Sequence, residues 1–340
     1  MRAAVLRTPG GGLEVGEVPT PVPGPGEARV RVIGCGFCHT DLHYLDHGVA
    51  TAKPPPLVLG HEISGRVDAL GPGTEGVAVG ATVLVPAVLP CGRCELCRTG
   101  RENICPDLRM LGNHLDGGFA EYTVVPAKDL VPLPPDIDPV SGAVIADAFT
   151  TPYHAVVRRA RVLAGERVAV VGCGGVGMNV VQFAAASGAE VVAVDLSAAK
   201  LELARRLGAS ETIDAGQVSD VGREVRRTFG DGVDVAFEAV GNPTTIATAF
   251  TTLRRGGRLC LVGFSSAPAV LPAGRVMFFE QSVIGSLGCR PGDYRRVIDL
   301  VRRKRVLLEP VVTERVSLEE IGTAADRLRQ GIGLRTVVVP

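Results

Sequence analysis

Four side chains that could do chemistry lie close together early in this sequence of 340 residues. They are Cys38, His39, Thr40 and His43, within the stretch GCGFCHTDLHY. Thiolates and imidazoles are ligands that zinc prefers in proteins, and packing alone does not require them at this density. Buried cysteine and histidine are also common in hydrophobic cores, so the stretch by itself leaves that reading open. We interpret it as one wall of a metal-dependent catalytic site.

His61 and Glu62, in the segment GHEISG, are candidates for the same site. A catalytic zinc ion needs three protein ligands and a fourth position for water or substrate. Cys38 and His61 are suitable for two of the three. The spacing cannot show that they converge, and each could instead be a buried core residue.

Four further cysteines predict a second metal site, at Cys91, Cys94, Cys97 and Cys105. Four thiolates satisfy a tetrahedral zinc ion and leave no open position, which makes such a site structural rather than catalytic. A redox relay, the other common use of a C-x-x-C motif, would not need the third and fourth thiols. We therefore expect a structural zinc that folds a lobe with few apolar residues of its own.

The segment VAVVGCGGVG, residues 168–177, predicts a dinucleotide-binding turn between a strand and a helix. Gly172 permits the tight turn, Gly174 lets a pyrophosphate approach the backbone, and Gly177 lets the helix pack on the strand. The first N–H groups of the helix then meet the phosphates. The next strand ends at Asp195, whose carboxylate can accept hydrogen bonds from both ribose hydroxyls and would repel a 2′-phosphate. No arginine follows Asp195 directly, so we predict NAD rather than NADP; a glycine-rich turn in an ordinary sheet is the alternative.

The apolar pattern divides the sequence into two regions. Up to about residue 145, short β-branched runs lie between Gly and Pro clusters and predict a barrel-like all-β unit, with strands at 28–33, 65–69, 81–85 and 121–126. From about residue 150, runs of strand type alternate with helical periodicity, which predicts βαβ units and a parallel sheet, with strands at 167–171, 190–194, 233–239 and 258–262 and helices at 176–187 and 198–207. Helices at 294–303 and 318–330 and a strand at 335–339 complete the expected elements.

Length and composition favour a two-domain cytoplasmic protein. The 36 basic and 36 acidic residues balance, which argues against nucleic acid or a membrane surface as the main partner. No apolar run is long enough to span a bilayer, and the first residues lack a signal-peptide core. In a reducing compartment the nine cysteines are expected to be ligands or small core residues rather than disulfides.

Taken together, these motifs resemble those of the zinc-dependent medium-chain alcohol dehydrogenases (MDR family) over essentially the whole chain. GCGFCHTD, GHE, the four-cysteine lobe and GCGGVG occur in that family's order. The resemblance implies an α/β protein with a GroES-like β-barrel catalytic domain at residues 1–147, to which residues 290–340 return, and a Rossmann NAD-binding domain at residues 148–289. It also implies NAD and two zinc ions per chain, one catalytic and one structural.

The resemblance assigns roles to residues at matching positions. Cys38 and His61 match two catalytic zinc ligands, and Asp41 matches the carboxylate that orients the ligand histidine. Glu62 matches an acid beside the metal, Thr40 a hydroxyl that contacts the substrate oxygen, and His43 the outer end of a proton relay. The residues expected to bind the cofactor are His39, Thr151, Gly172, Gly174, Gly175, Val176, Gly177, Asp195, Lys200, Val262 and Arg335.

One position departs from the family pattern. Many members have a cysteine as the third zinc ligand shortly before the threonine that supports the nicotinamide, and Asp147 occupies that place here. A carboxylate oxygen is an acceptable zinc ligand, so we predict a site formed by Cys38, His61 and Asp147. The alternative is that Asp147 does not ligate and that the catalytic zinc is weak or absent.

The implied activity is hydride transfer between NAD and a primary or secondary alcohol. The resemblance places five residues around the substrate, with an apolar lining that suggests a hydrophobic, cyclic or aromatic alcohol: Ala87, Asn113, Phe149, Phe264 and Leu287. Two alternatives stay open: a reductase of activated C=C or C=N bonds with structural zinc only, and a non-enzymatic NAD-binding protein. The segment Ser282 to Leu287 resembles the one that joins sheets across a dimer, so we expect a homodimer or homotetramer.

Overall fold

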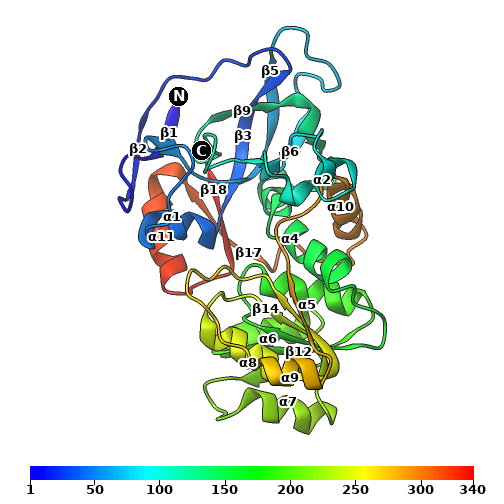
Figure 1. The fold of residues 1–340 in the computed structure, drawn as a ribbon. Coiled ribbons are helices and arrows are strands. Elements are labelled where there is room, and N and C mark those ends of the chain that lie inside the picture. The colour runs from blue at the N-terminus through cyan, green and yellow to red at the C-terminus, as the bar shows by residue number, and fades with distance from the viewer. The chain divides into compact units, whose positions relative to one another are not determined.

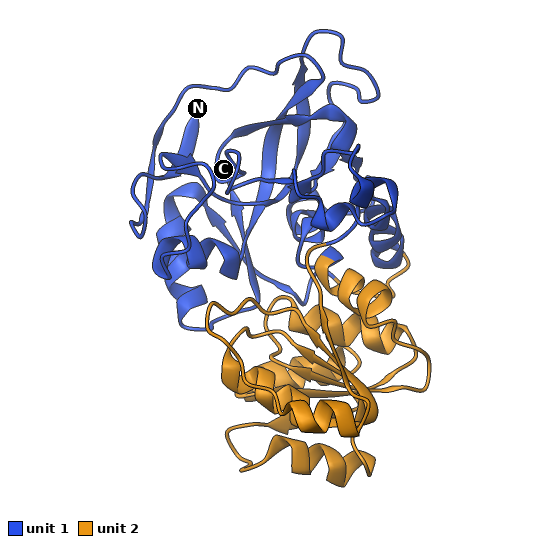
Figure 2. Cartoon of the chain, viewed as in Figure 1, with its two compact units in different colours: residues 1–150, 289–302, 308–340 blue, residues 151–288, 303–307 orange.

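The computed structural model describes all residues from 1 to 340 and divides into two compact units (Figure 2). Unit 1 comprises Met1–Thr150, Cys289–Arg302 and Leu308–Pro340, and unit 2 comprises Thr151–Gly288 and Arg303–Leu307. The expected divisions after residues 147 and 289 lie close to these limits. Residues 303–307 were expected in the same domain as residues 1–147, but they belong to unit 2. The reason is a contact with Gln182 of unit 2, whose side-chain amide accepts from Leu307 N at 2.7 Å and donates to Leu307 O at 3.2 Å.

Unit 1 is built on β-sheets. Its main sheet has the order β10-β6-β5-β3-β18-β17, with β9 also paired to β3, and a three-stranded sheet has the order β2-β1-β4. The strands are β1 (Arg2–Leu6), β2 (Leu13–Glu17), β3 (Glu27–Phe37), β4 (Leu57–Val58), β5 (Glu62–Leu70), β6 (Thr82–Val85), β7 (Val88–Leu89), β8 (Arg109–Met110), β9 (Tyr122–Pro126), β10 (Val131–Pro132), β17 (Val312–Ser317) and β18 (Arg335–Val339). The predicted β-rich region and closing strand are therefore confirmed.

Short helices connect the strands of unit 1. They are α1 (His39–Asp46), α2 (Glu95–Arg98), η1 (Glu102–Ile104), η2 (Ala127–Asp129), α3 (Pro139–Gly142), η3 (Ala143–Ala146), η5 (Pro291–Asp293), α10 (Tyr294–Arg302), η6 (Leu318–Glu320) and α11 (Ile321–Arg329). The predicted helix 318–330 thus consists of a 3₁₀ turn followed by α11. Alternate residues of β3, such as Ala28, Val30 and Val32, are buried in the unit's hydrophobic core, as a strand with one face inward requires.

Unit 2 contains a six-stranded parallel sheet with the order β13-β12-β11-β14-β15-β16. Its strands are β11 (Arg167–Val171), β12 (Glu190–Asp195), β13 (Glu211–Asp214), β14 (Val233–Glu238), β15 (Leu253–Leu261) and β16 (Ser282–Gly285). The helices are α5 (Gly177–Ala186), α6 (Ala198–Arg206), α7 (Val221–Phe229), α8 (Pro243–Thr251) and α9 (Ala273–Phe278), and they alternate with the strands (Figure 1). Upstream, α4 (Thr150–Tyr153) and the π-helical turn η4 (His154–Arg159) lead into this sheet.

The strand order of unit 2 indicates the edge of the sheet at which a ligand would bind. The sheet is Val-rich and buried, as expected for parallel strands covered on both faces. From β11 the chain moves outward through β12 to β13, and then returns to the other side of β11 at β14. Ligands of open α/β sheets bind at the carboxyl ends of the strands, where the strand order reverses in this way. The predicted parallel α/β region and its glycine-rich turn at the end of β11 are therefore confirmed as a Rossmann-type arrangement.

Candidate active site

Unit 1 brings together four potential metal ligands that are far apart in the sequence. Cys38 immediately precedes α1, His61 immediately precedes β5, Glu62 is the first residue of that strand, and Asp147 follows η3. Their ligand atoms all lie within 4.8 Å of one another. Cys38, His61 and Glu62 are buried, whereas the side chain of Asp147 is 20% exposed. The side chains therefore converge, which their spacing in the sequence could not show. The cluster includes Asp147, at the position that departs from the expected pattern.

Asp41 holds the first part of this cluster in place. Its carboxylate accepts hydrogen bonds from Cys38 N at 2.9 Å and from Gly60 N at 3.3 Å. The same carboxylate lies 3.6 Å from His61 Nδ1, while His61 Nε2 lies 3.6 Å from Asp147 Oδ2. Asp41 therefore fixes the backbone on both sides of the cluster and faces one edge of the His61 ring, with Asp147 at the other edge.

The charges of the cluster act strongly on one another because the site is buried. Burial alone would lower the pKa of His61, but the carboxylates of Asp41 and Asp147 outweigh it and raise that pKa well above its ordinary value. Burial raises the pKa of Cys38, yet Arg335 and His61 reverse the shift and lower it. For Glu62, burial dominates over the nearby Arg335 and raises the pKa to about 8. The arrangement favours a thiolate at Cys38, which is the form that binds metal.

The donor set fits zinc. Both ring nitrogens of His61 and both carboxylate oxygens of Glu62 are buried without a hydrogen-bond partner in the protein. Such groups are costly unless something else satisfies them. A thiolate, an imidazole and a carboxylate are accepted zinc ligands, and Glu62 adds a further oxygen within the same cluster. The residues present therefore fit a zinc ion at this position.

Arg335 lies behind Glu62. It is only 3% exposed, its Nε lies 3.5 Å from Glu62 Oε2, and one of its terminal nitrogens donates to Phe37 O at 3.1 Å. Its guanidinium therefore compensates a buried carboxylate at the metal cluster. Its expected contact with a cofactor pyrophosphate stays a prediction. Sequence reasoning did not identify this ion pair, because Glu62 and Arg335 are separated by most of the chain.

Thr40 and His43, the expected proton relay, both lie on α1. Cys38 Sγ lies 3.6 Å from Thr40 Oγ1, so the hydroxyl is adjacent to a candidate metal ligand. His43 is half-buried, and its Nδ1 lies 2.8 Å from Nδ1 of the exposed His47. Burial, together with the neighbouring His47, lowers the pKa of His43. His39, also exposed, begins the same helix.

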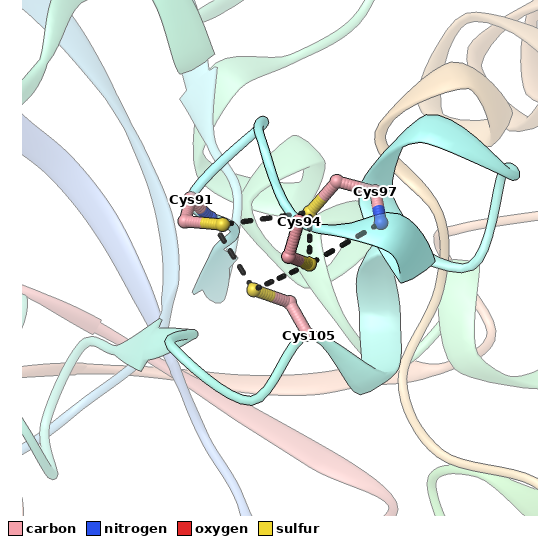
Figure 3. Close-up of side chains that lie close together, drawn as sticks. All are labelled: Cys91, Cys94, Cys97 and Cys105. Carbon is pink, nitrogen blue, oxygen red and sulfur yellow. Dashed lines mark hydrogen bonds between the residues drawn. The ribbon is translucent and has the colours of Figure 1, made fainter.

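The four cysteines of the predicted structural site converge in a separate lobe of unit 1. Cys94 caps α2 and Cys97 lies within it, and the two sulfurs are 3.5 Å apart (Figure 3). Cys91 and Cys97 are separated by 3.9 Å, and Cys94 and Cys105 by 3.8 Å. Thiolates at about 2.3 Å from a tetrahedral zinc lie roughly 3.8 Å apart, so these distances fit the ion. Hydrogen bonds from backbone N–H groups also lower the pKa of Cys91 to about 6.

The glycine-rich turn of unit 2 has the geometry that a dinucleotide needs. Gly172 has φ of +92°, and a side chain on Gly177 would collide with Gly172 O. A Cβ on Gly174, in contrast, would meet nothing within 4 Å, which leaves that face of the turn open to a ligand. Asp195 accepts hydrogen bonds from Cys173 N at 2.7 Å and from Ser197 N at 2.9 Å, so its carboxylate is fixed beside the turn. The start of α5 and the carboxylate thus fit a dinucleotide.

Glu238, at the end of β14, is a connecting residue that the sequence analysis missed. Its buried side chain accepts from Val240 N at 2.9 Å, Gly241 N at 2.7 Å and the Thr245 hydroxyl at 2.7 Å. Its backbone oxygen accepts from Val262 N at 2.9 Å. It therefore ties the loop after β14 to the loop after β15. A glutamate that ends an apolar strand, in DVAFEAVG, was the signal available in the sequence.

The remaining predicted site residues are distributed over both units. Ala87, Asn113 and Phe149 belong to unit 1, whereas Thr151, Lys200, Phe264 and Leu287 belong to unit 2. Phe149 is fully buried, while Phe264 and Leu287 are 54% and 59% exposed. The Asn113 side chain donates to the Tyr44 hydroxyl at 2.7 Å and accepts from Ala52 N at 3.2 Å. The roles of Thr151 and Lys200 at the cofactor, and of the other five residues in a substrate pocket, stay predictions.

Tyr294 supports the segment that carries Asp147. It is fully buried on α10, and its hydroxyl donates to Ala146 O at 2.8 Å. The C-terminal part of unit 1 therefore fixes the residue next to a candidate ligand.

Comparisons with known proteins agree with this arrangement. The family described as "Alcohol dehydrogenase GroES-like domain" matches residues 24–135, and the family "Zinc-binding dehydrogenase" matches residues 175–303. An alcohol dehydrogenase of Geobacillus stearothermophilus is 38% identical over 97% of this chain and 96% of its own length. An L-threonine 3-dehydrogenase of Saccharopolyspora erythraea is 32% identical, with the same coverage of both chains.

A solved structure is similar over the whole chain. It is a zinc-binding dehydrogenase of Sinorhizobium meliloti bound to NADP, with a TM-score of 0.90 and 32% identity, and the match covers 100% of this chain and 99% of the other. No helix of the present structure has the length and apolar character needed to cross a membrane.

Proposed function

Because this chain belongs to the zinc-dependent medium-chain alcohol dehydrogenase family, we propose that it oxidises a hydrophobic primary or secondary alcohol with NAD, or catalyses the reverse reduction. The observation that carries the proposal is the convergence of Cys38, His61 and Asp147 beside the hydroxyl of Thr40. Two metal-binding side chains alone could belong to a hydrophobic core, whereas three of them beside a hydroxyl that can accept a proton support a reaction site.

The ligand side chains would hold a catalytic zinc, and Asp41 would orient His61 from behind. When bound, zinc supplies a Lewis acid that makes the alcohol more acidic, and NAD supplies the hydride acceptor. Glu62 and Arg335 form a buried pair next to the cluster, so Arg335 would offset part of the cost of the negative charge when Glu62 is ionised beside the metal. The four cysteines would hold the second, structural zinc.

The chain's own residues provide the route for the proton. Thr40 Oγ1 would accept the alcohol proton, since a hydroxyl can donate and accept at the same time. His43 would receive it through the cofactor ribose and release it to solvent, because an imidazole exchanges protons near neutral pH. The half-buried position of His43 suits a group that connects a dry site with water.

The cofactor would be held by unit 2. Gly174 and the start of α5 would bind the pyrophosphate, and Asp195 the adenosine ribose. A fixed carboxylate at that position favours the free 2′-hydroxyl of NAD over the phosphate of NADP by charge repulsion. His39, Thr151, Lys200, Val262 and Arg335 are proposed as further cofactor contacts, and Ala87, Asn113, Phe149, Phe264 and Leu287 as the substrate lining.

We also propose that the protein is a homodimer or homotetramer. Strand β16 forms one edge of the unit 2 sheet, and Val283 on this strand is 41% exposed. Nearby in sequence, Met277 and Phe278 on α9 are 72% and 76% exposed. An open strand edge with exposed apolar side chains is suited to pairing with a second copy of the same sheet.

The test combines a substrate screen with a zinc count. Purified protein is assayed for reduction of NAD and of NADP with aliphatic, cyclic and aromatic alcohols, polyols and L-threonine, and zinc per chain is measured after desalting. We expect two zinc ions and NAD-linked oxidation of hydrophobic alcohols. One zinc per chain with reduction of activated C=C or C=N bonds would instead establish the alternative, a reductase with structural zinc only. Two zinc ions with activity only on L-threonine or only with NADP would refute the proposed specificity.

A further inference from the structure

Three histidines follow one another along α1 and its C-terminal cap, His47. His39, His43 and His47 are spaced four residues apart, which places them one above the other on a helix. His39 and His47 are exposed and His43 is half-buried. His39 and His43 have expected roles in the proposed reaction, whereas His47 has none.

The rings of His43 and His47 have converging nitrogen atoms. Their Nδ1 atoms are 2.8 Å apart, with ring centroids separated by 5.1 Å and planes inclined by 48°. A hydrogen bond between them requires one ring to donate its Nδ1 hydrogen and the other to accept. If the donor ring moves its hydrogen to Nε2, both Nδ1 lone pairs become available and no proton has to leave the pair.

We propose that His43 and His47 form a surface site for a divalent transition-metal ion of the nickel or copper type, separate from the two zinc sites. Imidazole nitrogens at about 2.0 to 2.1 Å from a divalent ion lie roughly 2.9 Å apart when they meet it at right angles, and roughly 3.4 Å apart in a tetrahedron. The observed 2.8 Å matches the right angle. Square-planar or tetragonal nitrogen coordination is characteristic of nickel and copper rather than zinc.

The side chains around His43 and His47 determine whether the ion would have further protein ligands. Asp46 is not offered as a ligand, because its two oxygens accept from Arg329 at 2.8 Å. That ion pair also offsets the positive charge of Arg329 near the histidines. The protein therefore supplies two nitrogens and solvent the other positions, which makes the ion exchangeable. The other three histidines offer no comparable pair: His61 and His154 are buried, and His114 accepts from Met110 N at 3.2 Å.

Metal binding at this pair would inhibit the enzyme. This consequence rests on the proposed function, in which His43 releases the proton to solvent. An ion on Nδ1 of His43 removes the lone pair that exchanges the proton with water, and therefore blocks the outer end of the relay. The inhibition would be reversible by chelators too weak to extract the two zinc ions.

Nickel binding to untagged, zinc-loaded protein tests the site directly. The probe is Ni²⁺, measured by titration calorimetry and by retention on an immobilised-nickel column, with zinc per chain counted before and after. The variants are His47→Asn and, as a matched control that also removes one exposed imidazole, His114→Asn. We expect one Ni²⁺ per chain in wild type and in His114→Asn, with at least tenfold weaker binding and early elution for His47→Asn. Equal nickel affinity in wild type and His47→Asn would overturn the site.

Two further measurements keep the result interpretable. His47→Gln with an unchanged melting temperature shows that lost binding does not come from lost folding, and His43→Asn should lose nickel to the same extent. In the activity arm, one equivalent of Ni²⁺ should inhibit wild type and His114→Asn but not His47→Asn. Nickel bound through the pair without inhibition would refute the block of the relay, and absence of any dehydrogenase activity would refute the proposed function while the binding result still decides the site.

Discussion

At the residue scale, we expect the aspartate at position 147 to decide how firmly the proposed catalytic zinc is held. A carboxylate is a harder ligand than the thiolate of many relatives, and zinc binds thiolates well. The side chain of Asp147 is also the most exposed of the four converging groups. The site should therefore release its zinc more easily than the four-cysteine lobe.

Replacement of Asp147 tests this directly. We expect Asp147→Ala to contain one zinc ion per chain instead of two, because two remaining ligands do not hold the ion through desalting, and to lose activity by at least about a hundredfold. Asp147→Cys should keep two zinc ions and resist chelators better than wild type. The measurements are zinc per chain by mass spectrometry and the rate of zinc loss to a chelator. Two tightly bound zinc ions in Asp147→Ala would show that Glu62, not Asp147, is the third ligand.

A second prediction at this scale concerns Glu238. Its side chain satisfies three donors in the loop after β14, and its removal leaves them without a charged acceptor. We expect Glu238→Ala to lower the free energy of unfolding of unit 2 by roughly 2 to 3 kcal/mol. We also expect NADH binding to weaken by about tenfold, because the loop beside the predicted cofactor site loses its anchor.

Glu238→Gln separates the two effects of that residue. The amide keeps one oxygen acceptor and nearly the same shape, so it should recover most of the stability and part of the NADH affinity. Glu211→Gln, an exposed carboxylate on β13 of the same sheet, is the matched control. The affinity is measured by NADH fluorescence. A Glu238→Ala protein with unaltered NADH binding would mean that the loop does not support the cofactor.

At the element scale, we expect the four-cysteine lobe to depend on a bound zinc ion more than on packing. It is formed by α2, η1 and the loops around them, and only short strands, β7 and β8, lie at its base. We expect Cys105→Ala to lose the structural zinc and to become sensitive to proteolysis within residues 91–105, because the binding energy of the ion is the folding energy of such a lobe. Cys260→Ala, which removes an equally buried thiol from β15, should keep both the zinc and the resistance to protease. Equal cleavage of the two variants would contradict the metal-dependent folding of the lobe.

An ion pair links the turn before β11 to β15, and we expect it to make the stability of unit 2 sensitive to acid. Arg258 donates to both carboxylate oxygens of Glu166, at 2.8 and 2.7 Å, and Leu163 N donates to the same carboxylate at 2.8 Å. Burial by itself raises the pKa of Glu166, but these hydrogen bonds outweigh it, so the pKa is lowered. A lowered carboxyl pKa stabilises the folded state above the unfolded value of about 4.3, and that contribution is lost as the pH falls through the folded pKa.

The corresponding variant is Glu166→Gln. At neutral pH we expect it to lower the free energy of unfolding by about 2 kcal/mol, since hydrogen bonds to a charged group are lost. The difference from wild type should shrink as the pH falls below about 4.3, where the wild-type carboxyl also becomes neutral. Denaturant unfolding at several pH values measures it. A difference that is constant across this range would show that the charge of Glu166 is not the source of the stability.

The elements themselves were largely predictable, and the reasons are local. Strand β11 and helix α5 were found at nearly their observed limits because apolar runs, helical periodicity and glycines mark them in the sequence. The strand β17 was not predicted, since only Val316 of its residues is buried and its pattern lacks an apolar run. The assignment of residues 303–307 to unit 2 also depends on a tertiary contact, from Gln182, that no local pattern encodes.

Those parts of the site that a single short sequence motif encodes were predictable. The four cysteines and the glycine-rich turn are each encoded in one short segment, so spacing was enough. The cluster of Cys38, His61 and Asp147 is assembled from three distant segments, and its prediction came from a family resemblance rather than from spacing. The contacts of Arg335 with Glu62, and of His43 with His47, depend on side-chain directions in the folded chain, which a sequence without a template does not specify.

At the scale of the whole molecule, each unit has its own hydrophobic core and its own part of the proposed reaction. Unit 1 carries the candidate metal ligands and unit 2 the dinucleotide turn. A chain organised in this way can lose one function while keeping the other. Asp147→Ala should therefore bind NADH with unchanged affinity, and Glu238→Ala should keep two zinc ions.

Assembly is the remaining property at this scale, and β16 is the strand to change. Across a two-fold axis an edge strand meets its own copy antiparallel, so a residue near the axis lies close to the same residue of the partner. Gly285 O already accepts from Arg159 at 2.8 Å, which leaves Ser282 to Ile284 for pairing. We expect Val283→Asp to shift wild-type dimers or tetramers to a smaller species, because two carboxylates would face each other in place of apolar side chains.

Val270→Asp is the matched control for assembly. It makes the same chemical change at a side chain that is 87% exposed and lies outside β16, so it should leave the mass unaltered. Light scattering coupled to size-exclusion chromatography measures the mass of each variant. A monomeric wild type would refute the oligomer, and a Val283→Asp protein of unchanged mass would place the interface elsewhere. A shift in Val283→Asp alone would identify β16 as the strand through which two sheets join, with the apolar side chains of α9 next to it in sequence as the adjoining part of the interface.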